Sequence, residues 1–188
     1  TKISPIFSTH IRSKIYWKIV IIVTTLCEFN MPNCWKTGKR EFITFNEICN
    51  ILKEVTISDS HVIIVGSDSV KLGYNFVFTK AICVLNAEYY DSKYFYFRDK
   101  IKDDSYLDLS KRLLKETVDS IDLAMKIKDI CCDANIEIHA DVNPDAKHLS
   151  SKYKNMISGY IQGCGFDVKI KPNSFVASSI ADHHTRKS

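Results

Sequence analysis

The stretch of sequence that decides the fold is residues 61–69, H-V-I-I-V-G-S-D-S. Its continuous apolar run, V-I-I-V, is typical of a β-strand that is covered on both faces of a sheet. Asp68 follows this run after Gly66 and Ser67. The pattern therefore predicts a buried strand over 61–68 that ends at an aspartate. A carboxylate held there by rigid backbone suits a metal ligand, whereas the alternative is an aspartate that only shapes a turn.

Two more strands and a helix are predicted around this stretch. Residues 76–85, F-V-F-T-K-A-I-C-V-L, and the aromatic residues 94–97 follow turns at 71–75 and 86–93. Connections this short indicate three antiparallel strands in sequence. Upstream, Thr44 and Glu47 have the spacing of a capping box, which predicts a helix over 44–55.

The second half of the chain alternates predicted helices with predicted strands. Amphipathic periodicity indicates helices from 103 or 104 to 130, over 149–164 and over 174–184, with strands at 135–140 and 166–170 between them. Right-handed crossovers would place these two strands parallel to the first, with 135–140 beside it. The prediction is an α/β fold with a mixed five-stranded sheet, in the order β-β-β-α-β-α-β-α, and helices on both faces.

The composition of the 188-residue chain is that of a soluble globular protein, with 45% hydrophobic and 26% charged residues. A net charge of +4 permits an anionic partner without requiring one. The seven cysteines form no C-x-x-C pair. This pattern favours reduced thiols in a cytoplasmic protein over disulfides or a zinc site.

The N-terminal residues differ in character from the rest. Residues 15–27 are strongly apolar, but Lys18 interrupts them and the segment is too short to span a bilayer comfortably. Met31 opens M-P-N-C-W-K-T-G, which resembles a natural start. We expect residues 1–30 to be an extension that is not native sequence, followed by one domain over 31–188. A genuine membrane anchor is the alternative, and the only basis for a membrane partner.

Four acidic residues stand out by their positions in the predicted elements: Asp68, Glu116, Asp141 and Asp182. Glu116 lies beside the apolar stripe of its helix, where a carboxylate without a metal or a salt-bridge partner is costly. Asp141 ends the fourth predicted strand. Asp182 follows Ser178 and Ser179, small residues that let the last helix approach the sheet, although a surface position is the alternative for this acid.

Four converging carboxylates could hold a pair of Mg²⁺ or Mn²⁺ ions, since all-oxygen ligands suit hard cations better than zinc. In a two-metal mechanism, one ion lowers the pKa of a water that attacks a phosphodiester, and the other stabilises the leaving oxygen. We therefore expect Asp68, Glu116, Asp141 and Asp182 to be both the catalytic residues and the metal ligands.

Five polar residues near these acids are candidates for contacts with the substrate. They are Ser69, His139, Asn143, Lys171 and His183. Lys171 could contact a backbone phosphate, as could nearby lysines. The alternatives are a packed, hydrogen-bonded role for His139, a favourable helix-end charge at His183, and a solvated surface for the lysines.

Four motifs together resemble the YkuK-like family of predicted RNase H-related nucleases, which occur in bacteria and their phages. The motifs are V-G-S-D-S (65–69), I-H-A-D-V-N-P-D-A-K (138–147), G-Y-I-Q-G-C-G-F (159–166) and K-I-K-P-N-S-F-V-A-S-S-I-A-D-H (169–183). The resemblance spans roughly residues 35–186 and implies an RNase H-like fold, with Asp68, Glu116 and Asp141 at acidic family positions. It leaves the fourth ligand open, because some relatives carry Asn at the position of Asp182 and others carry Asp at that of Asn173.

The expected function is a metal-dependent nuclease that acts on RNA, an RNA–DNA hybrid or structured nucleic acid such as branched DNA. The alternative is a nucleic-acid-binding module of the same fold with weak or no catalysis. A third possibility is a metal hydrolase that uses His139, Asp141, Asp182 and His183 with zinc or manganese. An actin-like ATPase is disfavoured, because Ser69 and Val70 stand where it needs glycine and the chain is too short for a second such domain.

Overall fold

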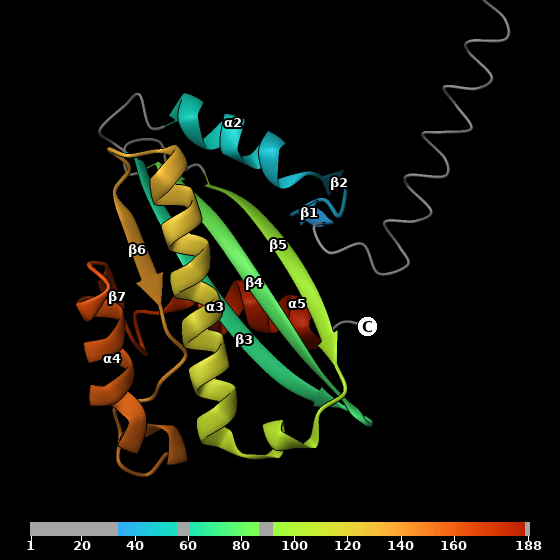
Figure 1. Cartoon of the computed structure of the whole chain (residues 1–188), viewed down its shortest axis with the longest axis vertical. Helices are drawn as coiled ribbons and strands as arrows, with labels where there is room; N and C mark the ends of the chain where they lie inside the picture. The colour runs from blue at the N-terminus through green and yellow to red at the C-terminus, as the bar shows by residue number, and fades with distance from the viewer. Residues whose placement is uncertain (1–33, 56–60, 87–91, 187–188) are drawn as a thin grey trace, which may run out of the picture. The chain divides into compact units, whose positions relative to one another are not determined.

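A single mixed sheet organises the computed structural model of this protein, which describes residues 34–55, 61–86 and 92–186. The strands are β1 (Trp35–Thr37), β2 (Phe42–Ile43), β3 (His61–Leu72), β4 (Asn75–Asn86), β5 (Ser92–Ile101), β6 (Ile136–His139) and β7 (Asp167–Lys169). The helices are α2 (Phe45–Val55), η2 (Asp104–Leu107), α3 (Leu109–Ile130), η3 (Leu149–Tyr153), α4 (Lys154–Gly163), η4 (Val176–Ala181) and α5 (Asp182–Arg186). The strand order is β2-β1-β5-β4-β3-β6-β7 (Figure 1).

The predicted antiparallel strands are present and longer than expected. β3 and β4 pair without a break from His61–Asn86 to Leu72–Asn75. The turn between them uses Gly73, whose φ of 60° suits glycine. Because this ladder runs past Asp68, the aspartate lies inside the strand, and the predicted strand end at residue 68 is wrong. β5 likewise extends beyond the predicted residues 94–97.

The predicted parallel strands are confirmed. β6 lies parallel to β3, from Ile63–Ile136 to Gly66–His139, and β7 lies parallel to β6. The α/β class with a mixed sheet is therefore confirmed, but the sheet has seven strands instead of five. The two additional strands, β1 and β2, have three and two residues. Such short segments carry no periodicity, and β1 is held by pairing with β5.

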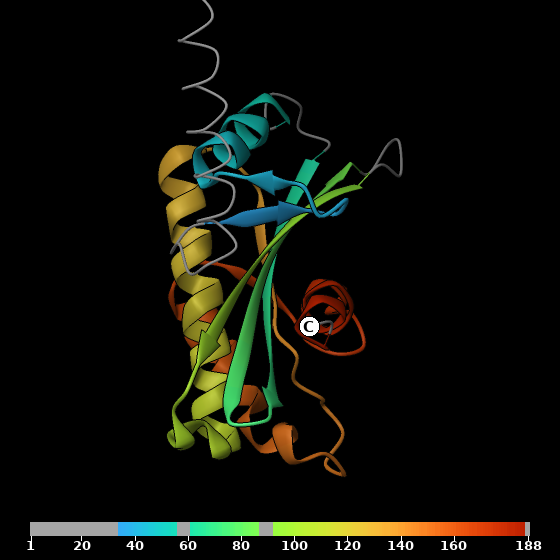
Figure 2. The ribbon, with the colours of Figure 1, turned by 90° about the vertical axis from the view of Figure 1, so that its right-hand side faces the viewer.

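The helices cover both faces of the sheet (Figure 2). One face packs against α2, α3 and α4 and buries the larger core, which includes Ile48, Ile82, Ile127 and Ile161. The other face carries η4 and α5 over a smaller core of Ile64, Ala81, Cys83, Val176 and Ala181.

The predicted helices are present, with irregular turns at their ends. The capping box before α2 is confirmed by hydrogen bonds from Thr44 N–H to Glu47 Oε2 (2.8 Å) and from Glu47 N–H to Thr44 Oγ1 (3.2 Å). The long helix begins at Leu109 instead of 103 or 104, because Asp108 caps α3 and Asp103 caps the separate 3₁₀ turn η2. The last predicted helix consists of a π-helical turn, η4, followed by α5.

The predicted extension over residues 1–30 and the apolar segment 15–27 lie outside the described residues. The boundary at residue 31 stays a prediction, and residues from Trp35 onward form one compact unit. None of the helices within the described residues has the length and apolar character needed to cross a membrane.

Candidate metal centre

The candidate site surrounds the point where the ladder between β3 and β6 ends. The last pair of that ladder is Gly66–His139, whereas β3 continues to Leu72. Asp68 lies two residues beyond this pair on β3, and Asp141 lies two residues beyond it in the segment after β6. The parallel register therefore brings the two aspartates to the same edge of β3.

Acids reach this edge from both faces of the sheet. Gly66 faces η4, since a Cβ atom built on it would lie 2.8 Å from the backbone N of Ala177. Because side chains alternate along a strand, Asp68 faces η4 and α5 as well, and Ser69 faces the opposite side. There Ser69 Oγ donates a hydrogen bond of 2.6 Å to Oε1 of Glu116 on α3.

The charges of neighbouring acids act on the pKa values of Asp68 and Glu116. Burial, together with the charges of Asp141 and Asp182, raises the pKa of Asp68 to about 7, against hydrogen bonds from Ser69 N–H and the Thr185 hydroxyl that lower it. Burial also raises the pKa of Glu116 well above its usual value, with further contributions from Asp68 and Asp141. Concentrated negative charge of this kind is what a bound cation would neutralise.

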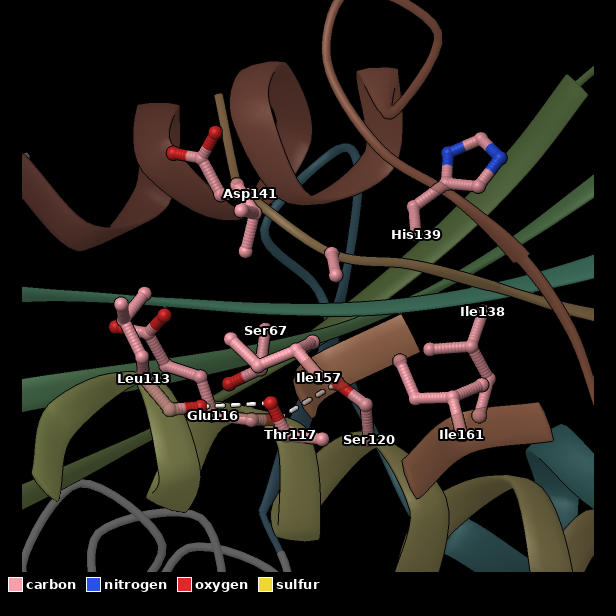
Figure 3. A pocket seen from close by; sticks show the side chains of 12 residues that line it. Ser67, Leu113, Glu116, Thr117, Ser120, Ile138, His139, Asp141, Ile157 and Ile161 are labelled. Atoms are coloured by element: carbon pink, nitrogen blue, oxygen red, sulfur yellow. Dashed lines mark hydrogen bonds between the residues drawn. The ribbon is translucent and has the colours of Figure 1, made fainter. Parts of the chain in front are cut away.

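Two of the acids line one small cavity between α3, α4 and the end of β6 (Figure 3). Its volume of about 10 Å³ corresponds to roughly one water molecule. Glu116 reaches it from α3, and Asp141 from the segment after β6. Ser67 also lines it, and its buried hydroxyl has no hydrogen-bond partner. The cavity thus has polar groups available for a water beside the acids.

Protein groups hold the acids in their present positions. Lys171 Nζ lies 2.6 Å from Oδ1 of Asp141, and the Ser69 hydroxyl holds Glu116. Within the described ranges, no three His, Cys, Asp or Glu side chains are arranged to hold a metal ion. The donor set nevertheless fits Mg²⁺ or Mn²⁺, because it supplies only carboxylate oxygens. Binding would require side chains such as that of Asp141 to exchange their present partners.

His139 is placed in the interior, with 1% of its surface exposed. Its Nε2 lies 2.6 Å from Glu137 Oε1, and its Nδ1 accepts a hydrogen bond of 3.2 Å from Val176 N–H. Burial lowers the pKa of this imidazole, which fits a neutral ring that donates from Nε2. Both nitrogens therefore have protein partners, and the bond at Nδ1 holds the start of η4. This arrangement favours the packed, hydrogen-bonded alternative for His139 over a substrate contact, and it disfavours its use as a zinc ligand.

The other predicted substrate contacts lie around the acids in different settings. The Asn143 side chain accepts a hydrogen bond of 3.0 Å from Asp145 N–H, which shapes the loop after Asp141. His183 is exposed next to Asp182 on α5. Ser69 and Lys171 touch Glu116 and Asp141 directly. These four residues therefore border the site, whereas the His139 side chain is buried.

The contacts that hold the last helix in place were not predicted from the sequence. His184 is buried, and its ring stacks on Tyr96 with centroids 3.6 Å apart. Arg98 Nη2 donates to the backbone oxygen of Thr185 at 3.4 Å. The available signal was the alternation of Tyr94, Tyr96 and Arg98, which places all three on one face of β5.

Comparison with protein families gives a match over most of the chain. A family model described as "Ribonuclease H-like" matches residues 44–186. This span contains all four acids and every element from α2 to α5. Neither a curated protein nor a solved structure gives a match.

Proposed function

The chain belongs to the ribonuclease H-like family, and from this premise we propose that it is a metal-dependent nuclease. Its substrate would be RNA, an RNA–DNA hybrid or structured nucleic acid such as branched DNA. One observation carries the proposal. Asp68, Glu116, Asp141 and Asp182 come from four separate segments around one strand edge, where burial and, secondly, the charges of neighbouring acids raise the pKa of Asp68 and Glu116.

The four carboxylates are the residues that would hold Mg²⁺ or Mn²⁺. When bound, such ions supply an activated water and stabilise the leaving oxygen of a phosphodiester. Neighbouring residues orient the carboxylates. Ser69 directs its hydroxyl at Glu116, and Thr185 hydrogen-bonds to Asp68. His139 holds the start of η4 through Val176, and η4 leads directly into α5, whose first residue is Asp182.

Nucleic acid would approach over the segments that border the acids. Lys171, Asn143 and His183 lie at this border, and the exposed lysines Lys147 and Lys152 follow Asp141 along the chain. Ammonium groups there would contact backbone phosphates and add a sequence-independent, salt-sensitive contribution to affinity. The net charge of +4 agrees with such a partner.

Cleavage assays test this proposal. Labelled RNA, RNA–DNA hybrid and branched DNA would be incubated with Mg²⁺, Mn²⁺ or EDTA. We expect metal-dependent cutting that falls roughly a hundredfold or more in Asp68→Asn and Glu116→Gln, the scale seen when one group that stabilises transition-state charge is lost. Asp122→Asn is the matched control, because Asp122 is an exposed acid on the same helix as Glu116 and should keep full activity.

A binding module without catalysis is the second candidate. The present side-chain positions favour it. Lys171 forms an ion pair with Asp141, and among the described residues no three His, Cys, Asp or Glu side chains are arranged to hold a metal ion. The same assay separates the two. Folded wild-type protein that binds nucleic acid but cuts none of the three substrates with either metal would favour the binding module.

A further inference from the structure

Lys171 is fixed beside Asp141 by the backbone. Ala140 N–H donates to Lys169 O at 2.9 Å, and Lys171 N–H donates to Val142 O at 3.1 Å. These bonds pair the segment after β6 with the segment after β7. The Lys171 side chain can therefore leave Asp141 without moving its own backbone away from the site.

The two side chains of the Lys171–Asp141 ion pair differ in exposure to solvent. The Lys171 side chain is 38% exposed, whereas that of Asp141 is 18% exposed. Lysine carries its charge on a flexible four-carbon stem, and partly exposed ion pairs contribute little to stability. A divalent cation held by several carboxylates would bind Asp141 more strongly than this single ammonium group does.

We propose that Lys171 acts as a tethered cation that exchanges partners when the metal binds. In the metal-free protein its ammonium group neutralises Asp141. Once a divalent metal occupies Asp141, the ammonium group is released and binds a phosphate of the nucleic acid. This inference rests on the proposed function, and it adds that metal binding and nucleic-acid binding are coupled through one side chain.

Lys169 provides a matched control two residues earlier. Its Nζ lies 2.8 Å from Oε2 of Glu137, and its side chain is 52% exposed. Glu137 is not one of the four converging acids. Substituting Lys169 therefore removes the same charge from the same strand end and breaks a comparable ion pair, without freeing a candidate metal ligand.

The first measurement is Mn²⁺ binding to metal-free protein by calorimetry. We expect Lys171→Met to bind Mn²⁺ roughly two- to fivefold more tightly than wild type, the factor that corresponds to losing a competing, partly exposed ion pair. Lys169→Met should bind Mn²⁺ as wild type does. Lys171→Gln is a second variant in case the methionine impairs folding, which thermal melting would reveal.

The second measurement is the affinity for a fluorescein-labelled RNA–DNA hybrid by fluorescence anisotropy, in EDTA and in Ca²⁺, an ion that carboxylates also bind. We expect Lys171→Met to weaken hybrid binding severalfold in Ca²⁺ and to leave it unchanged in EDTA, because the ammonium group is tied to Asp141 when metal is absent. Any effect of Lys169→Met should be the same in both conditions.

The outcomes separate the exchange of partners from the nuclease proposal. Equal Mn²⁺ affinity in wild type, Lys171→Met and Lys169→Met, or equal weakening of hybrid binding in EDTA and Ca²⁺, would overturn the role of Lys171 and leave the nuclease proposal standing. Absence of Mn²⁺ binding to wild-type protein would overturn both.

Discussion

At Asp68 the protein keeps a carboxyl group in surroundings that oppose its charge. The residue is 9% exposed, and burial together with Asp141 and Asp182 raises its pKa to about 7. A structural ion pair would have the opposite effect on an aspartate. A raised pKa in a cluster of acids is therefore more typical of a binding site than of a stabilising contact.

The metal-free protein should consequently lose stability as pH rises. The folded state binds the Asp68 proton more tightly than the unfolded state does, so the contribution is fully present below the usual pKa and is lost as pH rises to about 7. We expect a decrease on the order of a few kcal/mol in the free energy of unfolding. Urea titrations in EDTA between pH 4 and 8 would measure it.

Asp68→Asn should reduce this pH dependence, because the amide does not titrate, whereas buried Glu116, whose pKa is also raised, keeps its own contribution. Asp122→Asn serves as the control, since that acid is exposed, and it should retain the wild-type profile. Adding Mn²⁺ at pH 8 should restore stability to wild-type protein more than to Asp68→Asn. A wild-type stability that rises from pH 4 to pH 7 would contradict the proposed environment of Asp68.

At the scale of single residues, the sequence predicts the positions of the acids better than it predicts the residues that contact them. The position of Glu116 on the buried side of its helix follows from helical periodicity, and the structure confirms its burial. Contacts such as Ser69–Glu116 and Lys171–Asp141 join residues that are distant in sequence or in different segments. No local pattern encodes such contacts, because they depend on how the elements pack.

Among the elements, the last helix depends on a close approach to the sheet at Gly66. A Cβ atom at Gly66 would lie 2.8 Å from the N and 3.1 Å from the Cα of Ala177, both backbone atoms of η4. Gly66→Ala should therefore displace η4 and with it α5, which carries Asp182. We expect a loss of roughly 1–3 kcal/mol in the free energy of unfolding, the usual cost of overpacking, together with weaker Mn²⁺ binding.

Gly159 offers a matched control for that substitution. It lies in α4, and an added Cβ atom there would meet no atom within 4 Å. Gly159→Ala should stabilise the protein by roughly 0.5–1 kcal/mol, since alanine favours a helix over glycine, and should leave Mn²⁺ binding unchanged. Denaturant titration and calorimetry of both variants would test the pair. An unaltered stability of Gly66→Ala would show that η4 can shift freely.

Elements with a strong periodicity were predictable, and those fixed by tertiary contacts were not. The capping box located α2 because its hydrogen bonds are local. The start of the π-helical η4 is instead held by a hydrogen bond between Val176 and His139, 37 residues apart in sequence. A pattern read along the helix alone predicts an ordinary helix at this position.

For the whole molecule, the order of strands and helices fixed the class and the parallel pairing of β6 with β3. Right-handed crossovers leave few alternatives once that order is known. The additional strands β1 and β2 were beyond sequence interpretation, because residues 35–37 become a strand only by pairing with β5. The central strands and helices were thus predictable from local patterns, whereas the two short strands at the edge of the sheet were not.

The early end of the ladder between β3 and β6 has a consequence for how molecules meet one another. Beyond Gly66–His139, β3 runs on to Leu72 with β4 as its only strand partner among the described residues. An unpaired strand edge invites pairing with a second chain, and charged side chains are the usual protection. The clustered acids would thus guard the protein against self-association whether or not it cuts nucleic acid.

Light scattering on concentrated protein at pH 8 in EDTA would reveal this protection. The Asp68→Asn/Asp141→Asn double variant should associate more readily than Asp122→Asn/Asp129→Asn, which removes the same charge from exposed positions on α3. Equal scattering would leave the acids without this second role. If the difference is found, carboxylates at these positions would serve two purposes. The presence of the acids in a protein of this fold would then not by itself indicate catalysis.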